Sequence, residues 1–169
     1  MAMSPYVRAL RSHVGHARLL MPSVAGIVRD ADSRILLVQV RDDGTWTTPG
    51  GSMDPDETPA DAVVREVWEE TGLVVEPTGV VAVYGGRNFV VRYPNGDETQ
   101  YVSILFACSV RSGTLQSSGD DGDEIQAAQF WSRDDAEKLR LSAWLRDLLP
   151  HLYDADREAW FQPPTWRPS

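Results

Sequence analysis

The spacing of hydrophobic positions changes several times along the chain and divides it into expected strands and helices. Runs of β-branched and other apolar residues predict strands at 22–29, 34–40, 46–48, 79–84, 87–93, 99–110 and 125–131. Apolar residues three and four positions apart, or a capping serine, predict helices at 4–14, 59–71, 133–139 and 142–153. Because strands predominate and each helix must bury its apolar face, we expect an α/β fold with a mixed central β-sheet.

The segments between these elements predict the connections. The turn-forming residues Asp30 to Ser33 separate the first two strands, which we therefore expect to form a hairpin. Residues 111–123 are rich in Ser, Gly and Asp and are expected to form a loop, and the Pro-rich end has no regular pattern. We expect a lead-in helix in residues 1–19, one domain over 20–153 and an aromatic, Pro-rich tail over 154–169.

The helix over residues 59–71 has the clearest terminal signals. Thr58 is a favourable N-cap, Pro59 suits the first helical position and Asp61 completes a pair resembling a capping box. Gly72 follows the last helical residue and is a typical C-terminal cap. These local signals fix both ends of the helix.

Three carboxylates, Glu66, Glu69 and Glu70, fall on adjacent faces of this helix within about one turn. Like charges at this spacing destabilise an isolated helix, and the helix dipole disfavours anions in the last turn. A bound cation would remove both penalties, whereas the alternative interpretation is a solvated acidic face. Carboxylate oxygens favour Mg²⁺, with Mn²⁺ or Ca²⁺ in substitution, and an open carboxylate cluster suits phosphate chemistry.

The residues around the cluster favour the cation interpretation. Gly50 and Gly51 would let backbone carbonyls approach a metal closely, and Arg65 can reach Glu57 or a phosphate. The spacing resembles the Nudix box, G-x5-E-x7-R-E-U-x-E-E-x-G-U with U aliphatic, and every fixed position of that box matches. The matching residues are Gly51, Glu57, Arg65, Glu66, Val67, Glu69, Glu70, Gly72 and Leu73.

The resemblance implies an α/β/α sandwich that hydrolyses a nucleoside diphosphate linked to another moiety. It implies that Glu66, Glu69 and Glu70 bind a divalent metal, with the Gly50 carbonyl as a further ligand. Metal ions neutralise pyrophosphate oxygens and lower the pKa of a bound water. Mg²⁺ is the expected ion and Mn²⁺ the alternative.

The resemblance also implies that Glu57 and Arg65 orient the cluster. The general base varies within the family, and it is either a glutamate of the box, here Glu66, or an acid from a later loop. In that later loop Glu124 is the best candidate for a distal metal ligand or base, followed by Asp123, and the alternative for both residues is a polar turn.

Residues outside the box suggest substrate contacts. Arg87 and Arg92 flank an expected strand and are candidates for holding phosphate, while Tyr84 is a candidate for stacking on a base or, alternatively, for core packing. The substrate remains open between a nucleotide sugar such as ADP-ribose and a nucleoside triphosphate. The alternative function is a Nudix-fold nucleotide-binding or sensor module without catalysis, although the complete acid set favours an enzyme.

Composition narrows the expected partners and location. The 169 residues carry a net charge of −9, which disfavours nucleic acid and anionic membranes as partners. The single cysteine excludes an intrachain disulfide and a zinc site of several cysteines, and no stretch resembles a signal or a membrane span. We therefore expect a cytoplasmic protein. The aromatic residues Trp160, Phe161 and Trp166 near the end favour a homodimer.

Overall fold

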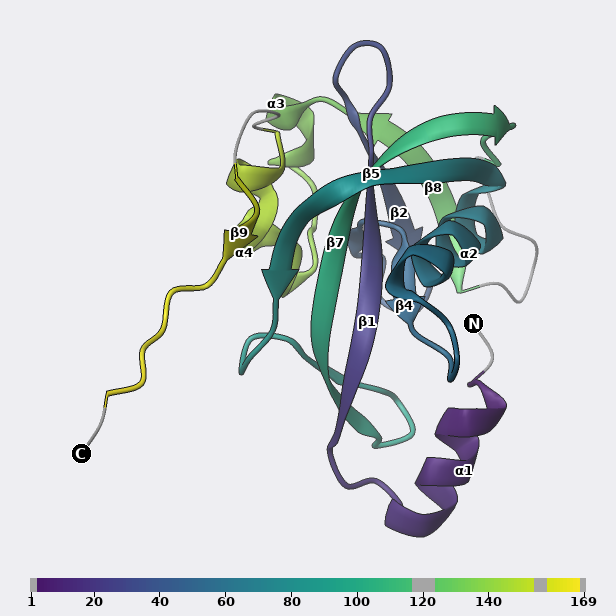
Figure 1. Ribbon diagram of the computed structural model, residues 1–169, viewed down its shortest axis with the longest axis vertical. Helices are drawn as coiled ribbons and strands as arrows, with labels where there is room; N and C mark the ends of the chain where they lie inside the picture. The colour runs from purple at the N-terminus through teal and green to yellow at the C-terminus, as the bar shows by residue number, and fades with distance from the viewer. Residues whose placement is uncertain (1–2, 117–123, 154–157, 168–169) are drawn as a thin grey trace.

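The computed structural model describes residues 3–116, 124–153 and 158–167, which form a mixed α/β fold (Figure 1). The helices are α1 (Pro5–Val14), α2 (Pro59–Thr71), α3 (Arg133–Ala136) and α4 (Ala143–Leu152). The strands are β1 (Leu19–Val28), β2 (Ile35–Val40), β3 (Trp46–Thr47), β4 (Gly50–Ser52), β5 (Leu73–Tyr84), β6 (Val90–Arg92), β7 (Glu98–Gly113), β8 (Ile125–Trp131) and β9 (Trp160–Phe161). The expected α/β class with a mixed sheet is confirmed.

The larger sheet is mixed and has the strand order β4-β1-β7-β5-β9, with β6 also paired to β7. Its longest parallel contact joins β1 to β7, from Leu19 opposite Thr99 to Val28 opposite Cys108. Strand β5 runs antiparallel to β7, and β4 runs antiparallel to β1. The residues of β1 from Ser23 to Val28 are all buried, as expected of a strand covered on both faces.

The expected hairpin of the first two strands is wrong. The two strands form no ladder: an isolated antiparallel bridge joins Arg29, which follows β1, to Ile35, and β2 belongs to a second sheet of order β3-β2-β8. The apolar runs identified both strands correctly. A continuous apolar run does not specify a partner, however, and here packing on both faces of β1 separates the two strands.

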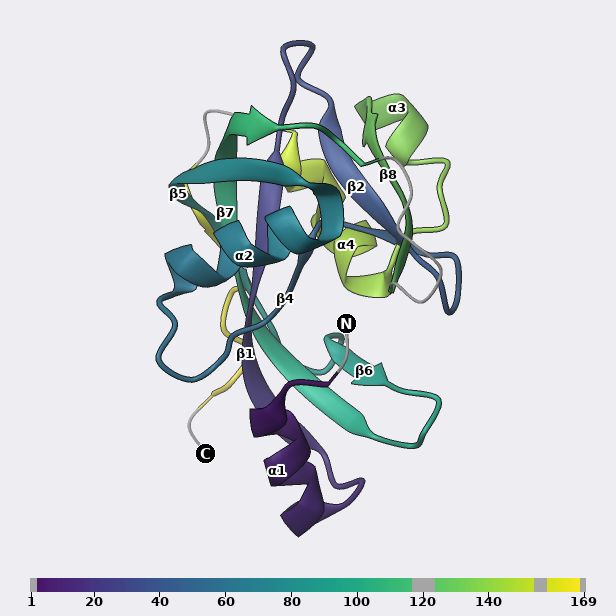
Figure 2. The same ribbon diagram turned by 90° about the vertical axis from the view of Figure 1, so that its right-hand side faces the viewer.

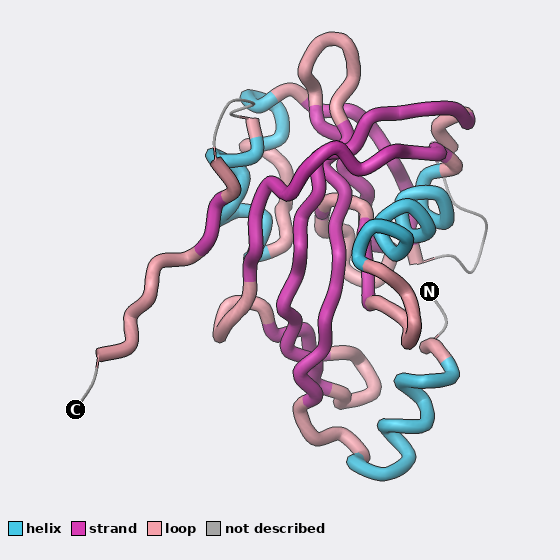
Figure 3. The backbone as a smooth tube through the Cα atoms, in the orientation of Figure 1, coloured by secondary structure: helices cyan, strands magenta, loops and turns pink. Residues whose placement is uncertain are grey.

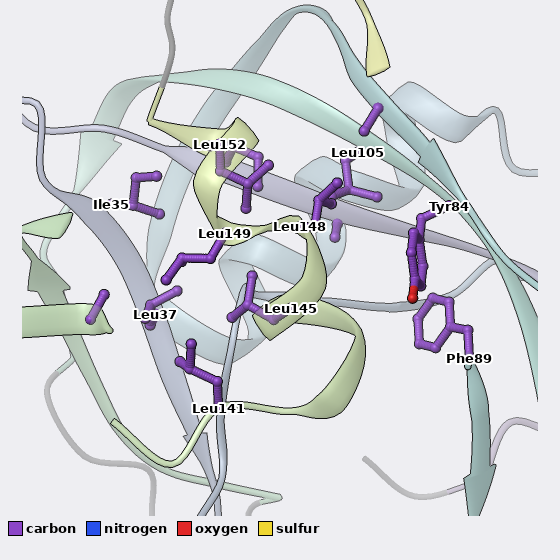
Figure 4. Close-up of a cluster of buried hydrophobic side chains, with 14 residues drawn as sticks. Ile35, Leu37, Tyr84, Phe89, Leu105, Leu141, Leu145, Leu148, Leu149 and Leu152 are labelled. Carbon is purple, nitrogen blue, oxygen red and sulfur yellow. The ribbon is translucent and has the colours of Figure 1, made fainter. Parts of the chain in front are cut away.

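Two hydrophobic clusters lie between the strands and the helices that cover them. Helix α2 covers one cluster through Ala62, Val63 and Val67. Helix α4 covers the other through its leucines, which meet Ile35 and Leu37 of β2 (Figure 4). Figure 1 shows α2 and α4 on opposite sides of the long strands. This arrangement leaves the acidic face of α2 beside β4 rather than in a core.

The ends of α2 agree with the sequence signals. The Asp61 amide donates a hydrogen bond to Thr58 Oγ1 at 3.2 Å, and Gly72 adopts the left-handed conformation with φ of 72°. Strand β5 then begins at Leu73 rather than at residue 79, and the predicted start was late because Pro77 interrupts its pattern beside a register shift. Helix α3 ends at Ala136, which is earlier than predicted.

The segment expected to be a tail contributes a strand. Strand β9 pairs in parallel with Ala82 and Val83 of β5, and the Trp160 ring stacks on Tyr84 with centroids 6.1 Å apart. Figure 3 shows residues 162–167, which follow β9, extending away from the sheet. Within the described residues, no helix has the length and apolar character needed to cross a membrane.

Candidate active site

A cavity of about 480 Å³ lies along the larger sheet and is lined by segments distant in sequence. Strands β1 and β7, the β3–β4 segment, the turn between β6 and β7, and helix α1 all contribute to its walls. Arg65 and Glu70 of α2, together with Glu124, line it as well. The glutamate-bearing helix and the long strands therefore face one space.

Two adjacent glycines allow this close arrangement. Gly50 has φ of 155°, and a Cβ there would overlap the Val24 carbonyl of β1. A Cβ at Gly51 would lie 2.6 Å from Glu66 Oε1, so the carboxylate of α2 lies directly against the β4 backbone. The Gly50 amide also donates a hydrogen bond to Glu70 Oε2 at 3.0 Å.

Among the acidic side chains that the structure describes, Glu66 is the most buried and has no exposed surface. Its Oε1 accepts a hydrogen bond from Arg65 Nη1 at 2.8 Å, whereas its Oε2 has no hydrogen-bond partner among the described residues. Burial raises the pKa of Glu66 to about 7; Arg65 opposes this shift, and the charges of Glu69 and Glu124 add to it.

The charged form of Glu70 is also destabilised by its surroundings. Burial raises its pKa well above the usual range, and the neighbouring charge of Glu66 raises it further. The hydrogen bond from Gly50 opposes this shift only in part. Two close carboxylates with raised pKa values and one unpartnered buried oxygen fit a cation, because a cation would stabilise both anions.

The acids do not converge into a finished coordination sphere. Within the ranges that the structure describes, no group of three acid, histidine or cysteine side chains is arranged to hold a metal ion. The Glu69 side chain is 38% exposed and accepts from Arg65 Nη1 at 3.3 Å instead. The residue types therefore fit a hard cation, while Arg65 occupies part of the acidic face.

Arg65 connects the loop before α2 to the buried acid. Its Nε and Nη2 donate to the two oxygens of Glu57 at 2.7 and 2.9 Å, and Nη2 also donates to the Ser52 carbonyl at 3.1 Å. The hydrogen bond from Arg65 is the main cause of the lowered pKa of Glu57. This bidentate pair fixes the guanidinium beside Glu66.

The distal acid Glu124 lies immediately before β8 and is exposed. It lines the same cavity as Glu70, and its charge contributes to the raised pKa values of both Glu66 and Glu70. The structure therefore brings Glu124 near the cluster from a different element. Asp123, the second candidate, lies outside the described residues.

The structure does not bring the three suggested substrate contacts to this cavity. Tyr84 is 4% exposed in the core of Figure 4, where its ring contacts Phe89 and its hydroxyl donates to Asp147 at 3.3 Å. Arg92 is exposed and pairs with Glu98, because the strand period turns it away while Val91 and Tyr93 face the cavity. Arg87 is exposed and does not line the cavity.

Several cavity residues had no sequence signal. The hydroxyls of Tyr93 and Tyr101 lie 2.8 Å apart at the wall, and Tyr101 also meets Ser52 Oγ at 3.4 Å. Ser23 and Thr48 are buried beside the cavity, and neither hydroxyl has a hydrogen-bond partner in the described part of the chain. Only the strand pairing places these residues together.

Comparison with known proteins gives a consistent picture. The family model described as NUDIX domain matches residues 19–152. A MutT-like protein of Streptomyces ambofaciens is 38% identical over 98 residues, covering 58% of this chain and 57% of that protein. An ADP-ribose pyrophosphatase of Methanocaldococcus jannaschii is 34% identical over 125 residues, covering 71% of this chain and 68% of its own.

The fold also matches solved structures. An ADP-ribose pyrophosphatase from Streptococcus suis superposes with a TM-score of 0.63 at 30% identity, covering 84% of this chain and 96% of that one. The matches to curated relatives are shorter, and the first three span 57%, 68% and 46% of those proteins. The residues that the family model matches include the three glutamates of α2.

Proposed function

The chain belongs to the Nudix family, and on that premise we propose that it is a pyrophosphohydrolase dependent on a divalent cation. Its substrate would be a nucleoside diphosphate linked to another moiety. ADP-ribose is the first candidate, because the relatives from M. jannaschii and S. suis both carry the name ADP-ribose pyrophosphatase. A nucleoside triphosphate is the alternative.

One observation carries this proposal, namely the buried Glu66 carboxylate beside the cavity that Glu70 lines. Its Oε2 is unpartnered within the described residues, and its pKa is raised to about 7. A buried carboxylate without a partner costs free energy, which a bound cation would offset. A substrate phosphate in the cavity could then complete the coordination of that cation.

Glu66, Glu69 and Glu70 would hold Mg²⁺ or Mn²⁺, together with the Gly50 carbonyl. When bound, such an ion would neutralise charge on the pyrophosphate and lower the pKa of a water molecule. The Gly50 amide donates to Glu70, so the same backbone segment positions a glutamate and offers a carbonyl. Glu69 would have to leave Arg65, to which it is hydrogen-bonded at 3.3 Å.

The chain's own residues divide the remaining tasks. Glu57 fixes Arg65, and Arg65 fixes one oxygen of Glu66 through the 2.8 Å hydrogen bond. Glu124 lines the same cavity from a different element, and we assign its carboxylate the role of accepting the proton of the attacking water. Glu66, the box glutamate that is buried beside the cavity, is the alternative base.

The deciding experiment measures hydrolysis of ADP-ribose and the nucleoside triphosphates with Mg²⁺ or Mn²⁺, and with excess chelator. We expect ADP-ribose to yield AMP and ribose 5-phosphate, and chelator to abolish the reaction. Full activity in chelator would contradict cation dependence. Nucleotide binding without hydrolysis of any compound would instead favour the binding or sensor module.

The homodimer belongs to the same proposal. Trp160 packs on its own chain beside Tyr84 and His151, but Phe161 and Trp166 remain 68% and 76% exposed. Exposed aromatic side chains are typical of interfaces. Light scattering of the full chain should give twice the monomer mass, and the monomer mass would contradict the dimer.

A further inference from the structure

Helix α1 lies outside the region that the family model matches, yet it borders the cavity. The match begins at residue 19, whereas α1 spans Pro5–Val14. None of its residues is buried, so it does not rest on a hydrophobic core. Ser4, Val7 and Arg11 repeat at helical spacing and line the cavity. Figure 2 shows α1 and β6 at the same end of the molecule, opposite α3.

Arg11 fixes this helix on the start of β7. Its Nη2 donates to the Glu98 carbonyl at 2.7 Å and to Thr99 Oγ1 at 3.0 Å, and its Nη1 donates to the Ala17 carbonyl at 2.6 Å. Asp97 lies 3.5 Å from Arg11 Nε and also accepts from His16 at 2.7 Å. Nη1 and Nη2 are therefore hydrogen-bonded to protein acceptors, whereas the buried Nε lies near the Asp97 carboxylate without a hydrogen bond among the described residues.

The cavity floor consists of small hydroxyl residues. Ser23 of β1 lies opposite Ser52 of β4 and Ser103 of β7, so the three serines form a row on one face of the sheet. Ser23 is 5% exposed and Ser103 is 2% exposed, and Ser23 Oγ has no partner within the described ranges. Small residues leave a hollow, and an unpartnered buried hydroxyl favours a polar ligand.

Aromatic rings form the adjoining wall. The Phe89 ring lies 5.6 Å from Tyr101 and 5.2 Å from Trp144, and all three residues line the cavity. The cations among the described lining residues are Arg11 and Arg65, and both are engaged with protein groups. The end of the cavity near α1 therefore suits an uncharged planar group better than a further phosphate.

We infer that α1 closes a nucleobase compartment, in which Val7 forms the wall and the serine row forms the floor. This inference rests on the proposed function, because the base is part of the substrate whose pyrophosphate faces the glutamates. The compartment is completed by residues outside the matched domain. Nucleobase binding in this chain consequently depends on its N-terminal helix as well as on the matched domain.

The test measures equilibrium binding to the full chain by calorimetry, which requires no hydrolysis. AMP, GMP, CMP and UMP are each compared with ribose 5-phosphate, which lacks a base. We expect at least one nucleotide to bind 10-fold or more tightly than ribose 5-phosphate, on the order of the stacking free energy of one base. Val7→Trp should remove that difference and leave ribose 5-phosphate binding unchanged.

Val14→Trp is the matched control, because Val14 is on the same helix, is 42% exposed and does not line the cavity. Ser23→Val fills the floor from a different element and should also abolish the preference for nucleotides. Unfolding temperatures identify any variant that fails to fold. Loss of the preference in Val7→Trp and Ser23→Val, but not in Val14→Trp, supports the compartment.

Equal binding of nucleotides and ribose 5-phosphate by the unsubstituted chain would overturn the inference. Unchanged nucleotide preference in folded Val7→Trp and Ser23→Val would overturn it too, as would an equal loss in Val14→Trp. If the preference behaves as expected but no compound is hydrolysed, the proposed hydrolase fails and the compartment stands. The failure of one proposal can therefore be distinguished from the failure of the other.

Discussion

The carboxylate of Glu66 lies so close to Gly51 that a Cβ at position 51 would be 2.6 Å from Glu66 Oε1. The glycine of β4 and the glutamate of α2 are fifteen positions apart in the chain. They therefore form a structural unit in which the absent side chain of one residue provides space for the carboxylate of the other.

Gly51→Ala should displace the Glu66 carboxylate and lower kcat/KM by about 100-fold or more, because a shift of about 1 Å is costly at a catalytic site. The unfolding free energy should fall by about 1 to 3 kcal/mol through overpacking. Gly79→Ala is the control, since a Cβ there meets nothing within 4 Å. Activity of Gly51→Ala equal to that of Gly79→Ala would show that this contact is unimportant.

Glu70→Gln and Glu69→Gln should each lower turnover by about 100-fold or more, since each removes an anionic ligand. In the presence of excess chelator, the Glu70→Gln variant should unfold at the same temperature as the unsubstituted protein or at a higher one. A neutral amide avoids the charge repulsion from Glu66 and can still accept the hydrogen bond from the Gly50 amide. Glu137→Gln, an exposed acid paired with Arg133, is the control. Undiminished turnover in the two box variants would refute their ligand roles.

Glu124→Gln distinguishes three roles for the distal acid. If Glu124 is the base, kcat should fall strongly while KM and the Mg²⁺ requirement change little. If it is a ligand, half-maximal activity should require more Mg²⁺, and excess Mg²⁺ should restore part of the rate. If neither parameter changes, Glu66 becomes the base to test. Initial rates across a matrix of substrate and Mg²⁺ concentrations separate these outcomes.

Asp97 should make the fold sensitive to acid. Hydrogen bonding from His16 is the main cause of the lowered pKa of Asp97; burial opposes this shift, and Asn95 and Arg11 add to it. A carboxyl whose pKa is lower when folded stabilises the protein fully above its unfolded pKa of about 3.9. That contribution is lost as the pH falls through the folded value.

Asp97→Asn should therefore be less stable than the unsubstituted protein at pH 7 and should lose less stability between pH 5 and pH 3. Denaturant unfolding at a series of pH values measures this difference. Asp42→Asn, at an exposed position, serves as the control. Parallel pH profiles for Asp97→Asn and the unsubstituted protein would contradict the assignment.

The sequence predicts features whose causes are local. The bounds of α2 follow from Thr58 and Gly72, which act within one turn, and the acidic cluster follows from the spacing of glutamates on one helix. The partner of β1 could not be predicted in this way. Its apolar run is equally compatible with β2 and with β7, and the choice depends on packing across the whole domain.

The same limit applies to the expected substrate contacts. To place Arg92 correctly one must know which residues of β6 face the cavity, because a shift of one residue exchanges the two faces of a strand. To place Tyr84 in the core one must know that its ring contacts Trp144 and Trp160, which come from the distant C-terminal part of the chain. The row of Ser23, Ser52 and Ser103 exists only through pairing, so no spacing in the sequence reveals it.

The parallel pairing of β1 with β7 also constrains when the cavity can form. Leu19 pairs with Thr99 and Val28 with Cys108, so each contact closes a loop of about eighty residues, which is a slow step in folding. Ser23 and Ser103 lie at the two ends of such a loop. During synthesis on the ribosome, the floor of the cavity therefore cannot exist until β7 has emerged, and a chain stopped before that point exposes the apolar surface of β1 to aggregation.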